Sequence, residues 1–165
     1  MLPIALDPTT VRVGLAGQGE GLERRRRLLA EGGVDQPVRV NEGAALDGLS
    51  LLFVAGLDRA ASAALADRAR AAGVLVNVED VPDLCNFHVP AILRRGDLAF
   101  TVSTNSKAPG LSRLLRERLG RLFGPEWDER VNTVAAARTE WRQQGHAPDA
   151  VSQRLRDLVQ GKGWL

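Results

Sequence analysis

The fold is decided by residues 11–22, which read VRVGLAGQGEGL. The apolar stretch 11–16 has the composition of a buried strand, and residues 23–29 after the glycines indicate a helix. Glycine lets the backbone adopt positive φ angles and approach a diphosphate closely, and the first N–H groups of a helix attract anions. A glycine-rich turn between a strand and a helix is therefore typical of a dinucleotide-binding site.

The glycine spacing selects candidate cofactor-binding residues. Leu22 stands where the usual pattern has its third small residue, and a glycine lies one position earlier. The acidic side chain of Glu42, just after a short strand at 38–40, favours NAD over NADP because a carboxylate repels a 2′-phosphate. The alternative is that the glycines form only a tight turn and that Glu42 is a solvated loop residue. The predicted NAD-binding residues are Gly17, Gly19, Glu20, Gly21, Glu42 and Gly43.

The rest of the N-terminal part alternates strands with helices. Strands are expected at 51–55, 74–78 and 98–102, and a helix at 59–72. This alternation predicts an α/β fold with a Rossmann-like, largely parallel sheet. Ligands of such sheets bind beyond the carboxyl ends of the strands, which here are followed by loops at 17–22, 41–44, 79–88 and 103–109.

The sequence pattern changes after Pro109 from alternating strands and helices to helices alone. Apolar residues at helical spacing predict helices from about 111 to 122, 126 to 144 and 149 to 160. We therefore predict a Rossmann-like NAD-binding domain over 1–110 and a dimerisation and helical region over 111–165. These helices have no evident partner sheet, so dimerisation or packing on the Rossmann body is expected.

Composition restricts the function classes. Of 165 residues, 44% are hydrophobic and 25% charged, which is ordinary for a globular protein. The net charge of +2 is too small to indicate nucleic-acid binding, and the longest apolar run is too short to span a bilayer. A single cysteine and the absence of a secretory leader pattern lead us to expect a cytoplasmic protein.

An acidic loop follows the strand at 74–78. Asp80 at this ligand edge suits a general base or a metal ligand, although a role as a cap or turn residue is equally compatible with its position. Cys85 and His88 lie close by, but one Cys-x-x-His pair does not supply the four ligands of a structural zinc site. No metal site is predicted.

The segment from 76 to 119 is the most specific part of the chain. It contains VNVEDVPDLCNFHVPAI (76–92), RRGDL (94–98), VSTNSKAP (102–109) and LLRERL (114–119). Together with LPIAL (2–6) and ERRRRLL (23–29), these stretches resemble the siroheme synthase N-terminal module family. The resemblance extends over about residues 1–125.

This resemblance implies a precorrin-2 dehydrogenase that uses NAD⁺ as hydride acceptor and produces sirohydrochlorin. Members are often bifunctional and also insert Fe²⁺ as ferrochelatases. The family forms homodimers with the tetrapyrrole site between protomers. The family's key aspartate falls on Asp80. Its hydroxyl-rich loop, which faces the tetrapyrrole, falls on 103–107 and includes Ser103, Thr104, Asn105 and Lys107. Arg113 and Arg116 lie nearby and are candidates to bind the carboxylates of the substrate, with solvation on a helix surface as the alternative for each.

Three departures from the family pattern touch the cofactor side. Gln18 replaces the middle of three glycines, Leu22 replaces an alanine, and Leu57 replaces a threonine. They leave two alternatives open. One is a non-catalytic module that binds a tetrapyrrole or NAD, and the other is a chelatase that has lost hydride transfer.

Overall fold

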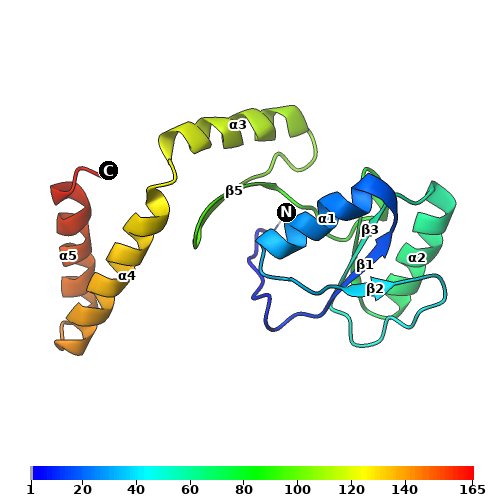
Figure 1. Ribbon diagram of the computed structural model, residues 1–165, viewed down its shortest axis with the longest axis horizontal. Coiled ribbons are helices and arrows are strands. Elements are labelled where there is room, and N and C mark those ends of the chain that lie inside the picture. The colour runs from blue at the N-terminus through cyan, green and yellow to red at the C-terminus, as the bar shows by residue number, and fades with distance from the viewer. Residues whose placement is uncertain (1) are drawn as a thin grey trace. The chain divides into compact units, whose positions relative to one another are not determined.

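The computed structural model describes residues 2–165, which form two compact units that meet at Val89 and Pro90. In the first unit, four strands and two α-helices follow one another in the order β1-α1-β2-β3-α2-β4, with no helix between β2 and β3, and a short 3₁₀ helix follows the last strand (Figure 1). Their bounds are β1 Val13–Gly17, α1 Gly19–Glu31, β2 Val38–Val40, β3 Leu51–Ala55, α2 Arg59–Ala71, β4 Leu75–Val78 and η1 Pro82–Leu84.

The four strands of the first unit form one parallel sheet in the order β2-β1-β3-β4. After β1 the chain forms β2 on one side of β1 and then β3 on the other side, so the direction of winding reverses at β1. In parallel sheets, ligands bind at such a switch point, beyond the carboxyl ends of the strands. The turn after β1 is therefore the position that the topology selects for a ligand.

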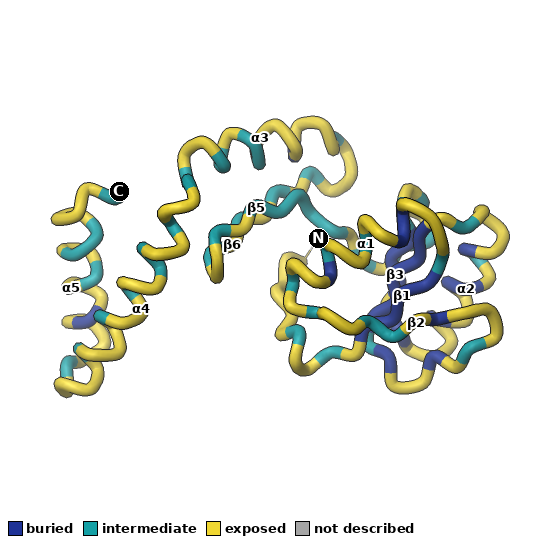
Figure 2. Tube along the Cα trace, in the orientation of Figure 1, coloured by how far each residue is buried: buried dark blue, intermediate teal, exposed yellow. Residues whose placement is uncertain are grey.

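Alternate residues of the strands face opposite layers. Leu52 and Val54 of β3 pack with Leu65 and Ala66 of α2, whereas Leu51 and Phe53 point to the other face, where α1 packs. Figure 2 shows that the buried residues follow β1, β3 and the inner side of α2. The continuous apolar sequence of β3 reflects this burial on both faces, and the parallel α/β fold expected from the sequence is confirmed.

The second unit contains a β-hairpin and three helices. Their bounds are β5 Ala91–Arg95, β6 Leu98–Val102, α3 Pro109–Leu122, α4 Trp127–Gln143 and α5 Pro148–Gly161. The three helices lie where the sequence predicts them. Packing of α4 on α5 is supported by Arg130, whose guanidinium stacks on Trp127 at 5.0 Å and on Trp164 at 5.3 Å.

The strand at 98–102 corrects one expectation. It does not join the parallel sheet but pairs antiparallel with β5, which the sequence analysis missed, in a separate two-stranded sheet. The signal was the pair Gly96-Asp97 between two short strands, since such two-residue connections favour hairpins. Gly96 has a φ of +56°, which suits this turn.

The hairpin also changes how the C-terminal half is organised. Helix α3 packs on β5 and β6, so this helix has a partner sheet, contrary to the expectation from the sequence. Arg95 reinforces this packing by donating to the carbonyl oxygens of Phe123 at 2.9 Å and Gly120 at 3.3 Å. The structure accordingly divides at residue 89, whereas the sequence-based division lies at 110. No helix among residues 2–165 is both long enough and apolar enough to cross a membrane.

Candidate functional site

The turn after β1 has the backbone that its glycines predict. Gly17 has a φ of +119°, and a Cβ there would collide with the carbonyl oxygen of Ala55. Gly19 has a φ of +67°, and no heavy atom lies within 4 Å of the position that its Cβ would occupy. The first glycine is therefore required by the protein's own packing, whereas the second borders open space where a ligand can approach the backbone.

The third small position of the motif is filled by Gly21 rather than by residue 22. A Cβ on Gly21 would lie 3.4 Å from the Cβ of Ala55 and 3.3 Å from the nitrogen of Gly56, so this glycine allows α1 to approach the end of β3. Leu22 points into the core between α1 and the sheet and is only 6% exposed. Its side chain therefore packs against Leu15 and Phe53 and does not enter the phosphate turn.

Gly56 accounts for the departure at Gln18. Gly56 has a φ of +68°, and a Cβ there would collide with the carbonyl oxygen of Gln18. The Gln18 nitrogen in turn donates to the carbonyl oxygen of Ala55 at 3.1 Å. Because Gln18 is extended, with a φ of −156°, this position does not require glycine. The turns after β1 and β3 thus pack backbone to backbone, a contact that the sequence analysis missed.

The start of α1 offers hydrogen-bond donors to a ligand. Its N-cap residue, Gln18, makes no side-chain capping hydrogen bond, whereas the Asp58 side chain caps α2 by accepting from the nitrogen of Ala61 at 2.8 Å. Uncapped N–H groups at a helix N-terminus carry a partial positive charge and bind phosphate. The Glu20 side chain, predicted to contact the cofactor, is almost fully exposed and lies 3.9 Å from Arg24.

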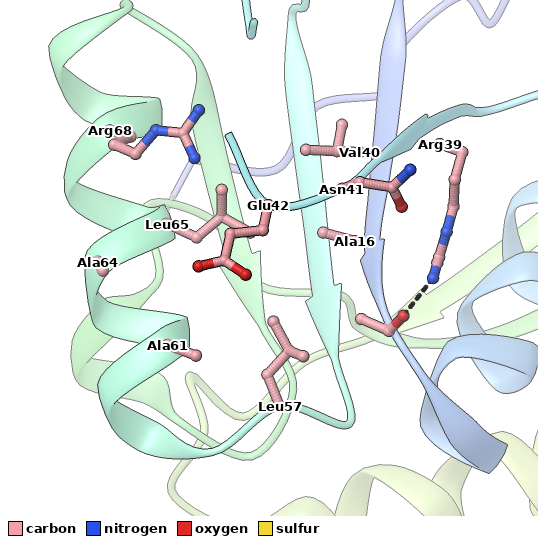
Figure 3. Close-up of a pocket in the computed structure, with 11 residues that line it drawn as sticks. Ala16, Arg39, Val40, Asn41, Glu42, Leu57, Ala61, Ala64, Leu65 and Arg68 are labelled. Carbon is pink, nitrogen blue, oxygen red and sulfur yellow. Dashed lines mark hydrogen bonds between the residues drawn. The ribbon is translucent and has the colours of Figure 1, made fainter. Parts of the chain in front are cut away.

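A cavity of about 430 Å³ continues from this turn between β2 and α2 (Figure 3). Glu42 lies in its wall, and in Figure 3 the Glu42 carboxylate points into the cavity from the loop after β2. Gly43, the next predicted cofactor residue, has a φ of +75° but is not part of the wall. The structure brings Gly17 and Glu42 together at one cavity, whose lining residues are Ala16, Gly17, Arg39, Val40, Asn41, Glu42, Leu57, Ala61, Ala64, Leu65 and Arg68.

Two arginines in this cavity were missed by the sequence analysis. Arg39 donates to the carbonyl oxygen of Gly17 at 2.5 Å, and Arg68 donates to that of Ala44 at 2.6 Å. Each guanidinium thus ties one loop of the site to a neighbouring element. Because side chains alternate between the two faces of a strand, Arg39 points to the opposite face from the residues before and after it in β2. Nothing in the sequence, however, identifies Gly17 as its hydrogen-bond partner.

Asp80 lies in the turn after β4, at the same carboxyl edge of the sheet as the glycine turn. It is exposed and has a φ of +59°, a left-handed conformation that Asp tolerates better than most residues. Within residues 2–165, no hydrogen bond or ion pair engages its carboxylate. Asp80 is not part of the cavity wall that contains Glu42.

The loop that carries Asp80 is held by its own polar groups. The Cys85 sulfur accepts from the Val78 nitrogen at 3.2 Å and lies 3.3 Å from the carbonyl oxygen of Val81. Asn77 donates to the carbonyl oxygen of Phe87 at 2.9 Å, and Asn86 accepts from the nitrogen of Val76 at 3.1 Å. Cys85 is therefore a packing and hydrogen-bonding residue of this loop.

An exposed ion pair joins the same loop to α2. Arg59 donates to both oxygens of Asp83, at 2.6 and 3.3 Å. The hydrogen bond from Arg59 lowers the pKa of the Asp83 carboxyl group and raises the pKa of the guanidinium. Arg70 adds a hydrogen bond of 2.7 Å to the carbonyl oxygen of Leu84.

The predicted substrate residues belong to the second unit, after the hairpin, and not to the edge of the parallel sheet. The Thr104 hydroxyl accepts from the Ala108 nitrogen at 3.1 Å and lies 3.2 Å from the Ser112 hydroxyl, so it serves the start of α3. Ser103, Asn105 and Lys107 are exposed, and Asn105 has a φ of +53°. Arg113 is exposed and pairs with Glu117 at 3.4 Å.

Within residues 2–165, histidine, cysteine and acidic side chains do not gather in the groups of three or more that a metal site needs. His88 and Cys85 share the loop after β4 but belong to no such group in the described part of the chain.

Comparisons with known proteins agree with this geometry. Residues 35–91 match a family model described as "Putative NAD(P)-binding". A siroheme synthase of Methylobacillus flagellatus is 37% identical over 129 residues, which are 78% of this chain and 26% of that protein. A siroheme synthase of Pseudomonas fluorescens is 31% identical and aligns with 93% of this chain and 37% of that protein.

The chain thus spans 26% to 37% of the length of these relatives. A solved structure of "SirC, precorrin-2 dehydrogenase" covers 96% of this chain, and this chain covers 89% of it, with a TM-score of 0.73 and 17% identity. At that identity the likeness shows a common fold. The glycine turn, the loop after β4 and these relatives lead to one conclusion: the chain belongs to the siroheme synthase N-terminal module family.

Proposed function

We propose that this protein binds NAD at the turn after β1 and oxidises precorrin-2 to sirohydrochlorin. The observation that carries the proposal is the uncapped start of α1, with open space at Gly19, next to a cavity that holds an acidic residue. The names of the relatives, siroheme synthase and precorrin-2 dehydrogenase, supply the reaction.

The residues present fit a dinucleotide. N–H groups at the start of α1 would hold the diphosphate, and the Glu42 carboxylate would accept hydrogen bonds from the ribose hydroxyls. The small side chains of Ala61 and Ala64 leave room for a flat base between α2 and the loop after β2. Glu42 also favours NAD over NADP, because it would repel a 2′-phosphate. When bound, NAD⁺ supplies the acceptor for the hydride.

Asp80 is the group proposed to move the proton. Loss of a hydride from precorrin-2 must be accompanied by loss of a proton, and an exposed carboxylate with no partner among the described residues can accept it. Ser103, Asn105 and Lys107, with Arg113, are proposed to bind the acetate and propionate groups of the tetrapyrrole. For Thr104 we propose a supporting role, because its hydroxyl is occupied at α3.

We propose that the working form is a homodimer. Helix α3 presents large apolar side chains to solvent, including Leu114 at 58% exposure and Leu111 at 49%. A surface of this kind marks an interaction site. The variant Leu111→Ser/Leu114→Ser should elute as a monomer with an unchanged circular dichroism spectrum. A wild-type monomer by light scattering would contradict the dimer.

Ferrochelation is the second candidate activity. The free Asp80 carboxylate that favours it would take up the pyrrole protons that leave when Fe²⁺, as substrate, enters sirohydrochlorin. Purified protein supplied with sirohydrochlorin and Fe²⁺, and no NAD⁺, should form siroheme faster than the Asp80→Asn variant does. Equal rates for both proteins would exclude this role of Asp80. The cytoplasm, which a single cysteine suits, is the proposed compartment for both reactions.

The main test supplies precorrin-2 and NAD⁺ and follows NADH absorbance. The wild type should produce NADH. Asp80→Asn, which keeps a residue that tolerates a left-handed backbone, should retain ADP binding and lose turnover. The matched control is Asp47→Asn, which removes the same charge from another exposed loop of the first unit.

Gly19→Ala separates binding from chemistry. The added Cβ would enter the open space where the diphosphate is proposed to approach the backbone, so the variant should bind ADP more than tenfold more weakly. The left-handed strain at this position should lower the stability of the protein by only about 1–2 kcal/mol. A protein that binds ADP but yields no NADH would be a binding module. A protein that makes no NADH, binds no ADP, and still inserts iron would be a chelatase.

A further inference from the structure

Glu79 occupies an unusual place beside Asp80. Its side chain is 15% exposed, and its carboxylate lies against the first turns of α1. One oxygen, Oε2, accepts from Arg24 Nη2 at 3.2 Å, and Oε1 lies 3.7 Å from Arg25 Nε. Its backbone nitrogen donates to the carbonyl oxygen of Val54 at 2.9 Å. A single residue thus joins the end of β4 to α1 and β3.

This carboxylate also lies beside the glycine turn. A Cβ on Gly21, the third residue of α1, would collide with Glu79 Oε2. Negative charge near the start of a helix is stabilised by the same positive potential that attracts phosphate. The Glu79 carboxylate and a diphosphate bound at Gly17–Gly21 would therefore both be attracted by the positive potential at the start of α1. Because both are negatively charged, they would repel each other.

The two arginines are arranged around this carboxylate. Arg25 is 17% exposed, and its Nε is buried without a hydrogen-bond partner among the described residues. A buried guanidinium requires a nearby anion, because an unpaired buried charge is strongly unfavourable. Glu79 is the acidic residue that lies within 4 Å of both Arg24 and Arg25.

We propose that Glu79 is a positioning residue that holds the Asp80 turn against α1 through Arg24 and Arg25, and that its charge lowers the affinity of the neighbouring turn for the dinucleotide. Its effect on turnover rests on the function proposed above, whereas its effects on ADP binding and on the loop do not. Removal of the charge should strengthen ADP binding and at the same time release Asp80. If Glu79 had only a structural role, its replacement would weaken ADP binding as well as the hold on the Asp80 turn.

The first measurement is calorimetric titration with ADP. Glu79→Gln, which keeps the size of the side chain, should bind ADP about threefold to tenfold more tightly, because one repulsive charge near the diphosphate is removed. Arg24→Met should bind ADP more weakly, because the positive charge that partly neutralises the Glu79 carboxylate is then removed. The matched control is Glu23→Gln, which removes a carboxylate from α1 that pairs with Arg26 at 3.5 Å. The control should leave ADP binding within twofold of wild type.

The second measurement reports on the loop without using activity. The thiol of Cys85, the single cysteine, is held between Val78 and Val81 under the Asp80 turn. Release of this turn in Glu79→Gln should accelerate the reaction of Cys85 with a disulfide reagent at least fivefold relative to Glu23→Gln. In the NADH assay the same variant should show a lower kcat together with a lower KM for NAD⁺.

The outcomes separate the two proposals. Tighter ADP binding and faster thiol labelling support the role of Glu79 even where the wild type makes no NADH, a result that would reject only the dehydrogenase function. Weaker ADP binding in Glu79→Gln, or thiol labelling at the control rate, would overturn it. Thermal unfolding of each variant shows that the protein is folded in both measurements.

Discussion

Arg39 and Gly17 are joined by a hydrogen bond of 2.5 Å, donated by the guanidinium of the central residue of β2 to the carbonyl oxygen of the first glycine in the turn after β1. The next backbone nitrogen, that of Gln18, is bound to Ala55. The peptide between Gly17 and Gln18 is therefore fixed at both ends before any ligand arrives. Preorganisation of this kind raises affinity because less ordering remains for the ligand to induce.

Replacement of Arg39 by methionine should weaken ADP binding about fivefold, since one hydrogen bond of about 1 kcal/mol no longer orders the turn. The thermal midpoint should change little because Arg39 is exposed. Isothermal titration checks the affinity, with Arg27→Met as a control that removes an exposed arginine of α1. Equal affinities of the two variants would show that Arg39 does not order the turn.

Gly56 and Gly73 form a matched pair of left-handed glycines, with φ of +68° and +73°. Gly73→Ala meets no atom within 4 Å and should cost only backbone strain, about 1–2 kcal/mol. Gly56→Ala should cost about 3–5 kcal/mol, because its Cβ also collides with the backbone of Gln18. Urea unfolding measures both, and equal losses would refute the packing of the two turns.

Leu22 offers a test of the departure from the family pattern. If this side chain packs in the core, Leu22→Ala, which restores the family's residue, should lower the free energy of unfolding by about 2–5 kcal/mol. ADP affinity should stay unchanged in the folded protein, and Leu22→Met should cost less than about 1.5 kcal/mol. Stronger ADP binding by Leu22→Ala would instead mean that leucine narrows the phosphate turn.

The ion pair between Asp83 and Arg59 should hold the loop after β4 less strongly in acid. Its pKa is lowered from 3.8 by the hydrogen bond from Arg59, so the folded state favours the ionised form. The stabilisation is complete above the unfolded pKa and is lost as the pH falls through the lower folded value. Asp83→Asn should therefore unfold at a slightly lower temperature than wild type at pH 7, and the difference should diminish as the pH falls below 3.8. A difference that persists in acid would assign the effect to something other than this ion pair.

The sequence predicts those features that depend on local patterns. Continuous apolar residues such as Leu51–Ala55 identify a strand buried on both faces, and the glycines at 17–21 identify the tight turn between β1 and α1. The strand at 98–102 was recognised, but its partner was not, because β5 ends in two arginines and its pairing depends on a two-residue turn. Pairing between segments is a tertiary property that composition alone does not determine.

The site shows the same division. Glu42 lies at the same cavity as Gly17 because an acidic residue after the second strand of such a sheet has a fixed position relative to the turn after the first strand. The contacts of Arg39, Gly56 and Glu79 were not predicted, because the partner of each lies 22, 38 or 55 residues away, at Gly17, Gln18 and Arg24 respectively. Their roles follow from the contacts of folded backbone, and no spacing in the chain reveals them.

The close approach of Glu79 to Gly21 also limits how this protein can have evolved. An alanine at 21 would occupy the space that the carboxylate now fills, and a buried Arg25 without Glu79 would lack its counter-ion. A side chain larger than hydrogen at position 21, or the loss of either charge, therefore has to be matched by a change at another of the three positions if the protein is to keep its stability.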